Sequence, residues 1–125
     1  KITNPDMTRF WITPRQAVNL VLTALSEKYR GKILVPKAPS RSMGQMAKTL
    51  YPEKKVAITG LRPGEKMHEC LISEDNKNVV LISDTHAEKP KRYVSCENDM
   101  VLDIVELKRH NKEIRDRSLA AQHNR

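Results

Sequence analysis

The first part of the chain combines an extended apolar segment with an amphipathic helical pattern. Residues 7–12 are rich in apolar, aromatic and β-branched side chains, which favours a strand. Thr13 can cap a helix, Pro14 suits its first position, and Gly31 ends a pattern that runs to about Glu27. The apolar residues of this predicted helix share one face: Ala17, Val18, Val21, Ala24 and Leu25.

A short strand and a second helix follow. Residues 33–35 form an apolar run closed by Pro36, and a loop is expected at residues 39–40. Ser42 can cap the next helix, which ends at Tyr51-Pro52. Its apolar residues follow helical spacing and are better explained as core than as a cofactor contact: Met43, Met46, Ala47 and Leu50.

The last third of the chain changes from apolar to polar. Residues 79–82 read as a buried strand, residues 84–90 as a loop and residues 92–94 as a short strand. A helical pattern begins near Asp99, and residues 108–117 are nearly all polar, typical of a solvated helix or a disordered end. We predict an α/β fold, with a small mixed sheet and flanking helices.

The most informative stretch is Gly-Leu-Arg-Pro-Gly-Glu-Lys at residues 60–66. It separates an apolar run at residues 56–59 from a helix-like run at residues 66–71, so we expect a strand, a tight turn and a helix start. With Pro63 at the first helical position, the following backbone N–H groups would face an anion such as phosphate.

The side chains of this turn suit the same ligand. Arg62 offers a planar fork of donors to phosphate oxygens, and Gly64 lets a ligand approach the backbone. Glu65 would either complement the helix dipole or accept hydrogen bonds from sugar hydroxyls. The alternative is a plain strand–helix turn with a surface arginine and glutamate, and short motifs of this kind often occur by chance.

Charge and length narrow the function classes. The chain has 125 residues, enough for one domain, and its net charge of +8 attracts anions such as nucleotides, nucleic acid or an acidic membrane surface. We expect no membrane span, because no apolar run approaches 18 residues. Cys70 and Cys96 make neither a disulfide framework nor a metal motif, so a cytoplasmic location is the default expectation.

Several kinds of catalytic site are missing from the sequence. The glycines do not have the spacing of a dinucleotide-binding loop, and His68-Glu69 lacks the second histidine of a zinc helix, since that position is Ile72. Tyr51 and Lys55 match a Tyr-x-x-x-Lys spacing, but they flank a helix end and a strand start, so we interpret the match as chance. We therefore expect no catalytic residue, cofactor-binding residue or metal ligand in this chain.

Two segments together resemble a known family. Residues 7–13 and 60–69, supported by residues 35–40 and 71–75, resemble the C-terminal, substrate-binding part of bacterial UDP-N-acetylglucosamine 4,6-dehydratases. These are extended short-chain dehydrogenases/reductases of surface polysaccharide and glycan synthesis. The resemblance covers about residues 3–94, and Phe10-Trp11 is similar to the shorter, soluble branch. Residues 41–43 depart from the family pattern, and residues 95–125 have no match.

The resemblance implies a role without catalysis. Family members bind NADP or NAD in an N-terminal Rossmann domain, oxidise C4 of the sugar, eliminate water across C5–C6 and return hydride at C6. Their catalytic residues and cofactor site lie in that N-terminal part. By resemblance, Arg9 and Arg62 would clamp the diphosphate of a UDP-sugar from two sides, and Glu65 would hold the ribose hydroxyls. A structural salt bridge is the alternative role for Arg9.

We therefore expect a UDP-sugar-binding domain at residues 1–95 and a basic helix or partly disordered tail at residues 96–125. A domain without its Rossmann partner should expose apolar surface, which predicts self-association, docking to a Rossmann domain or coverage by the C-terminal helix. A nucleic-acid or anionic-surface binding module and a non-catalytic interaction module remain alternatives. Few aromatic residues and no binding motif argue against nucleic acid.

Overall fold

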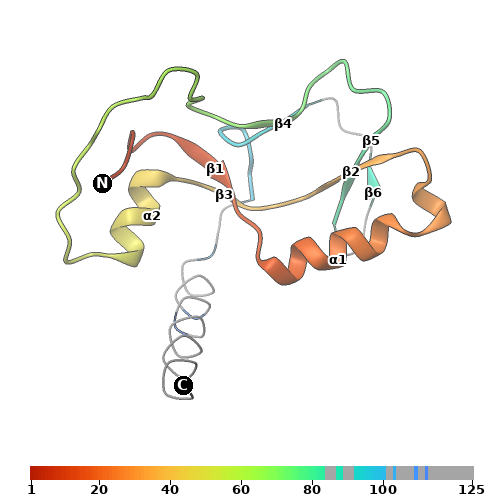
Figure 1. Ribbon diagram of the computed structural model, residues 1–125, viewed down its shortest axis with the longest axis horizontal. Helices are drawn as coiled ribbons and strands as arrows, with labels where there is room; N and C mark the ends of the chain where they lie inside the picture. The colour runs from red at the N-terminus through yellow and green to blue at the C-terminus, as the bar shows by residue number, and fades with distance from the viewer. Residues whose placement is uncertain (84–86, 89–91, 101–102, 104–108, 110–111, 113–125) are drawn as a thin grey trace.

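The described part of the chain folds as a small α/β structure of two α-helices and three small sheets (Figure 1). The computed structural model describes residues 1–83, 87–88, 92–100, 103, 109 and 112. One sheet is mixed, with β2 parallel to β5 and β5 antiparallel to β6, and the other two are antiparallel pairs. The mixed sheet contains β2 (Ile33–Pro36), β5 (Val79–Ile82) and β6 (Ala87–Glu88). The pairs are β1 (Thr8–Phe10) with β3 (Ser40–Ser42), and β4 (Cys70–Ile72) with β7 (Tyr93–Val94).

The helix starts predicted at Thr13 and Ser42 are confirmed. Helix α1 (Pro14–Ala24) begins at a capping box, in which the Thr13 hydroxyl accepts from the Gln16 N–H at 3.2 Å and the Gln16 Oε1 accepts from the Thr13 N–H at 2.7 Å. Helix α2 (Met43–Leu50) begins at Ser42, whose hydroxyl accepts from the Gln45 N–H. After α1, a short 3₁₀ helix (Glu27–Tyr29) leads to Gly31, whose positive φ of 70° turns the chain into β2.

The core lies where the three sheets meet. Its buried apolar cluster comes from β2, β4, β5 and β7: Val35, Ile72, Val79, Leu81 and Tyr93. The ring of Phe10 packs against that of Tyr93, with ring centroids 4.6 Å apart. The Tyr93 hydroxyl accepts from the Ala38 N–H at 3.0 Å and donates to the Ala38 carbonyl at 2.8 Å, so this buried polar group is satisfied. Met46, from the predicted methionine stripe, is also buried.

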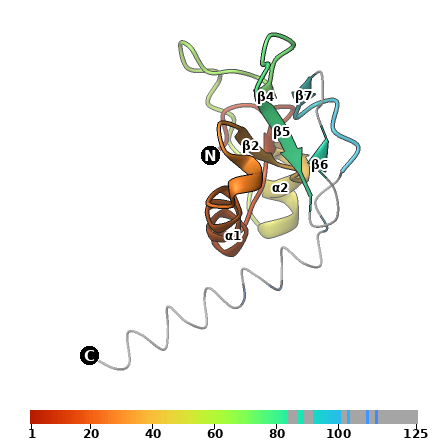
Figure 2. The ribbon, with the colours of Figure 1, turned by 90° about the vertical axis from the view of Figure 1, so that its right-hand side faces the viewer.

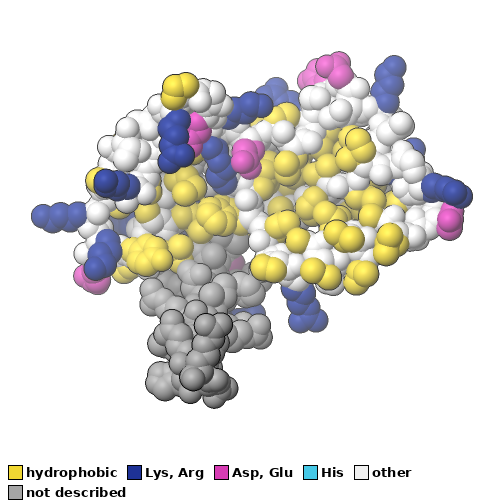
Figure 3. Space-filling model, in the orientation of Figure 1, with side chains coloured by type: hydrophobic (Ala, Val, Ile, Leu, Met, Phe, Trp, Pro, Cys, Tyr) yellow, Lys and Arg dark blue, Asp and Glu magenta, His cyan; other side chains and the backbone are white. Residues whose placement is uncertain are grey.

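Helix α1 turns its apolar face away from the molecule. Val18, Val21 and Leu25 are 58%, 62% and 77% exposed, and no residue of this helix is buried. The side that faces β2 carries Gln16, Asn19, Leu20 and Thr23 instead. Figure 2 shows α1 lying alongside β2 and β5. In Figure 3, hydrophobic side chains gather on the face that contains α1 and the mixed sheet.

The structure corrects the prediction for residues 56–71. The expected strand at residues 56–59 is wrong: among the described residues this run forms one isolated bridge, Ile2 with Ile58, and residues 51–64 are all exposed. The expected helix at residues 66–71 is also wrong, because the chain enters β4 at Cys70. Pairing with β7 decides this outcome, since it places Ile72 fully in the core opposite Tyr93.

Smaller differences concern loops and the C-terminal part. Residues 39–40 were expected to be a loop, yet Ser40 begins β3, and residues 87–88 inside the expected loop form β6. The short strand expected at residues 92–94 is confirmed as β7. The helix expected from about Asp99 and most of the basic tail lie outside the described residues. In the described part of the chain, no helix is long and apolar enough to cross a membrane.

Candidate functional site

The residues singled out from the sequence lie on a long loop between α2 and β4, and on β1 beside it. The loop holds a tight turn at Arg62–Glu65, in which the Glu65 N–H donates to the Arg62 carbonyl at 3.0 Å. Pro63 fixes φ at the first central position, and Gly64 supplies the positive φ of 78° that the second position requires. Because no helix follows, the expected phosphate site at a helix N-terminus is wrong.

The Glu65 side chain closes the turn a second time. Its Oε2 accepts from the Arg62 N–H at 3.2 Å, and its Oε1 accepts from the Thr3 hydroxyl at 3.5 Å. An ionised carboxylate has about four acceptor positions, so these two contacts leave room for further donors. Arg62 and Gly64 are exposed, and Glu65 is half-buried. The turn therefore presents three groups on one loop: the guanidinium of Arg62, the backbone of Gly64 without a side chain, and the Glu65 carboxylate with open acceptor positions.

The N-terminal segment anchors this loop on the upstream side of the turn. The Ile2 N–H donates to the Ala57 carbonyl at 2.9 Å, and the Ile2 carbonyl accepts from the Thr59 N–H at 2.9 Å. The Thr3 carbonyl then accepts from the Gly60 N–H at 3.1 Å. Figure 1 shows the loop leaving α2, passing the N-terminus and crossing the molecule to β4.

Arg9 anchors the loop on the downstream side. Its guanidinium donates to the carbonyl oxygens of Lys66 at 2.9 Å and of Met67 at 3.2 Å, and also to that of Thr8 at 2.7 Å. Its Nε lies 3.4 Å from a Glu69 carboxylate oxygen. Of the five N–H groups of an arginine, these contacts leave one on a side chain that is 21% exposed. Arg9 thus holds the downstream anchor of the loop, and Arg62 lies in the turn just upstream of that anchor. Within the described residues, the two arginines share no hydrogen-bond partner.

A cluster of hydroxyl groups supports the downstream anchor, and no motif in the sequence indicated it. The Thr8 Oγ1 lies 2.8 Å from the His68 Nδ1 and 2.6 Å from the Ser95 Oγ. The Ser95 hydroxyl also accepts from the Glu69 N–H at 2.9 Å. Ser95 is 87 residues from Thr8, so only the three-dimensional structure brings these groups together.

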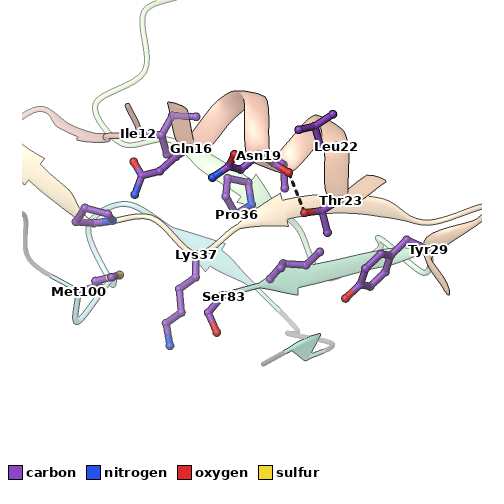
Figure 4. A pocket seen from close by; sticks show the side chains of 13 residues that line it. Ile12, Gln16, Asn19, Leu22, Thr23, Tyr29, Pro36, Lys37, Ser83 and Met100 are labelled. Atoms are coloured by element: carbon purple, nitrogen blue, oxygen red, sulfur yellow. Dashed lines mark hydrogen bonds between the residues drawn. The ribbon is translucent and has the colours of Figure 1, made fainter. Parts of the chain in front are cut away.

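Two cavities in the described part of the chain lie away from the turn at residues 62–65. A cavity of about 610 Å³ runs between α1 and the ends of β2 and β5, and Gln16, Lys37 and Ser83 are among its lining residues (Figure 4). A second, of about 350 Å³, lies between α2 and residues 51–56. None of Arg9, Arg62, Gly64 or Glu65 lines either cavity. The predicted binding residues therefore lie at the surface, outside both cavities. Arg62 and Gly64 are exposed, and Arg9 and Glu65 are half-buried.

The described residues do not fit a dinucleotide cofactor or a metal. Gly60 and Gly64 share the loop before β4, and none of the four glycines lies in a glycine-rich turn between a strand and a helix of a βαβ unit: Gly31, Gly44, Gly60 and Gly64. Among the described residues, no group of three histidine, cysteine or acidic side chains is placed to hold a metal ion. No chemical step through a bound cofactor or metal can therefore be assigned to these residues.

Comparisons with known proteins agree on the family. The chain is 35% identical over 106 residues to a Campylobacter jejuni (serotype O:2) protein named UDP-N-acetylglucosamine 4,6-dehydratase (inverting), covering 83% of this chain and 32% of that protein. A protein of the same name from serotype O:23/36 is 40% identical over 78 residues, covering 62% and 23%. A Rickettsia canadensis UDP-glucose 4-epimerase is 38% identical over 79 residues, covering 60% and 23%.

These matches have two consequences. The chain spans a third or less of the length of these relatives, so their complete activities cannot be transferred to it directly. The sequence model of the family described as "Polysaccharide biosynthesis protein" matches residues 1–90, which is most of the chain. The chain therefore belongs to the polysaccharide biosynthesis protein family, the family of UDP-sugar dehydratases and epimerases.

Proposed function

We propose that this chain is the nucleotide-sugar-binding part of an enzyme of the UDP-N-acetylglucosamine 4,6-dehydratase type, acting in surface polysaccharide or glycan synthesis. The observation that carries the proposal is the turn at residues 62–65. It holds an exposed arginine on a backbone closed by two hydrogen bonds, on a loop anchored at both ends. The names of the relatives point to UDP-sugars as the substrate class.

In this proposal each side chain of the turn has one task. Arg62 donates to the diphosphate through its exposed guanidinium. Gly64 lets the phosphate approach the backbone, because an added Cβ would occupy space that is open here. Glu65 keeps the turn closed and accepts from the ribose hydroxyls with its remaining acceptor positions.

Arg9 contributes differently from Arg62. Most of its N–H groups hold the carbonyl oxygens of residues 66 and 67, so one N–H remains for a phosphate oxygen. The larger effect of Arg9 is to fix the loop and to add positive charge beneath it. In this proposal Arg9 and Arg62 would still clamp the diphosphate from two sides, with Arg62 as the stronger donor.

The hydride chemistry belongs, in this proposal, to the part of the longer relatives that this chain does not span. NADP or NAD would bind there. The isolated chain is expected to bind a UDP-sugar without turnover. Both cysteines are free and exposed, which suits the reducing cytoplasm where nucleotide-sugar synthesis would take place.

The apolar face of α1 and the open edge of β2 form the proposed docking surface for that missing part. Parallel strands are normally buried within larger sheets with both faces covered. Here β2 lies at the edge of its sheet, and Ile33 is 60% exposed. A Rossmann-type sheet would extend this edge and cover Val21 and Leu25. Self-association of the isolated chain through the same face is the expected consequence when that sheet is absent.

Calorimetric titration with UDP and UDP-N-acetylglucosamine tests the binding proposal. Arg62→Ala removes a charge-assisted contact and should weaken binding roughly ten- to hundred-fold. Arg30→Ala is the matched control, because it removes the same charge from an exposed side chain on the 3₁₀ segment. Equal weakening by both variants would indicate attraction by net charge alone and favour the polyanion-binding alternative. No binding to the wild-type chain would overturn the proposal.

A further inference from the structure

Ser95 is a buried junction between three segments that are distant in sequence. It follows β7 directly, is 2% exposed, and its backbone N–H donates to the Glu69 carbonyl at 2.9 Å. Its carbonyl accepts from the Ser40 hydroxyl at 2.7 Å, and its own hydroxyl accepts from the Glu69 N–H at 2.9 Å. Ser95 therefore holds the end of the loop through both backbone polar groups of Glu69.

The Thr8 hydroxyl extends this junction to β1 and His68. It lies 2.6 Å from the Ser95 Oγ and 2.8 Å from the His68 Nδ1. With neutral His68 protonated at Nε2, Thr8 donates to Nδ1, Ser95 donates to Thr8, and the Glu69 N–H donates to Ser95. With a hydrogen on Nδ1 the first two bonds reverse, and Ser95 donates to the Thr8 carbonyl at 3.3 Å. Every hydroxyl is satisfied in both arrangements, so the junction holds in either state of the ring.

The same loop segment carries the contacts of Arg9. The Thr8 N–H donates to the Met67 carbonyl at 3.0 Å, the oxygen that Arg9 also contacts. Residues 66–69 are thus fixed by backbone, guanidinium and hydroxyl contacts at once. The turn at residues 62–65 ends directly before this anchor, and residues 62–64 are exposed. The direction in which Arg62 points therefore depends on how firmly residues 66–69 lie against β1.

We propose that Thr8 and Ser95 are positioning residues for the anion site: their linked hydroxyls lock residues 66–69 onto β1 and so set the orientation of Arg9 and Arg62. This inference rests on the proposed UDP-sugar binding and adds the residues that preorganise it. Neither hydroxyl touches the ligand. Loss of the link should loosen residues 66–69 and weaken the contacts of Arg9 and Arg62 to the diphosphate. Contacts to the nucleoside should change little, because Glu65 keeps its own contact with the Thr3 hydroxyl.

The test compares Thr8→Val with Thr8→Ser in titrations with UDP and with uridine. Valine keeps the shape of threonine and removes the hydroxyl, whereas serine keeps the hydroxyl. Thr8→Val should weaken UDP binding about tenfold and leave uridine binding unchanged, and Thr8→Ser should restore UDP binding. Ser95→Ala should give the same selective loss, and Ser26→Ala is its control because the exposed Ser26 side chain makes no cap hydrogen bond.

Two further readouts separate positioning from simple destabilisation. Amide exchange at Glu69 should speed up in Thr8→Val and Ser95→Ala, and the ¹⁵N shifts of the His68 ring should change in Thr8→Val. Partial unfolding would instead weaken UDP and uridine binding in proportion. If Thr8→Val fails to fold, Ser95→Ala and Thr8→Ser supply the comparison.

The outcomes distinguish this inference from the proposed function. Wild-type binding of UDP with equal affinity in folded Thr8→Val and Ser95→Ala overturns the positioning role alone. A proportional loss of UDP and uridine binding also overturns it. Failure of the wild-type chain to bind UDP overturns the proposed function, and the positioning role falls with it.

Discussion

Tyr93 connects the core of the molecule to the backbone at Ala38. Burial raises the pKa of its phenol above the ordinary value of 10.0, and the negative charge of Asp99 adds to this, while hydrogen bonds with Ala38 and Asn98 oppose it. A raised pKa means that the folded state retains the proton longer than the unfolded state. This contribution to stability is present in full below the ordinary tyrosine pKa and is lost as the pH rises through the folded value.

Replacement of Tyr93 by phenylalanine tests both parts of this argument. Tyr93→Phe leaves the buried Ala38 N–H without its partner, while the Ala38 carbonyl keeps its contact with the Asn98 side chain, so the free energy of unfolding near neutral pH should fall by about 1–2 kcal/mol. As the pH rises above 10.0, the wild-type chain should lose more stability than the variant. Urea unfolding at several pH values measures both effects. Tyr51→Phe, at an exposed side chain, is the control, and equal pH slopes in wild type and Tyr93→Phe would contradict the assignment.

At the scale of elements, the turn at residues 62–65 depends on the left-handed conformation of Gly64. An added Cβ would meet no atom within 4 Å, so Gly64→Ala adds only the backbone cost of positive φ, about 1 kcal/mol. Since residues 51–64 are all exposed, the turn can open without unfolding the core. UDP affinity should therefore fall about fivefold, while thermal stability changes little.

Gly31→Ala is the matched control for this prediction. Gly31 has a similar positive φ of 70° and equally open space for a Cβ, but it leads into the core strand β2. Its substitution should lower thermal stability and leave UDP affinity unchanged. Loss of UDP affinity in both variants, or in neither, would show that the conformation of the turn does not set binding.

The elements that could be predicted from sequence are those decided by neighbouring residues. Thr13 with Pro14 and Ser42 fix their helix starts through contacts within one turn, and both starts are confirmed. Residues 66–71 have a helical spacing of apolar side chains, yet Ile72 pairs with Tyr93 on β7, and that distant partner made the segment extended. The mixed α/β character followed from the pattern, whereas strand pairing did not.

The candidate site likewise has features that neighbouring residues decide and features that distant residues decide. Pro63 and Gly64 carry a turn signal that is visible in the sequence, and the turn is present. The helix expected after it is absent, so the predicted use of helix N–H groups failed. On the loop, the hydrogen-bond and ion-pair partners of Arg9 are 57 to 60 residues from it in sequence. Ser95 is 87 residues from Thr8. Their contacts arise only when β1 and the loop pack together.

At the scale of the whole molecule, helix α1 leaves much of its apolar face exposed, while a mixed set of polar and apolar side chains faces β2. Gln16, Asn19 and Thr23 line the cavity of about 610 Å³ beside β2, and Thr23 donates to the Asn19 carbonyl within the helix. The apolar stripe on the opposite side is exposed. A soluble helix is normally oriented the other way, with its apolar stripe towards its own core. We therefore assign the stripe to contacts with another folded unit.

Leu25→Lys tests this assignment in solution. Leu25 is 77% exposed, so the substitution should leave the free energy of unfolding nearly unchanged. In sedimentation experiments the wild-type chain should self-associate, and the lysine should weaken association about tenfold, because a charge would have to be buried in an apolar contact. Leu71→Lys, on exposed β4, adds the same charge away from α1 and should associate like the wild type. A wild-type chain that stays monomeric, or equal effects of both lysines, would show that the stripe on α1 is not a contact surface.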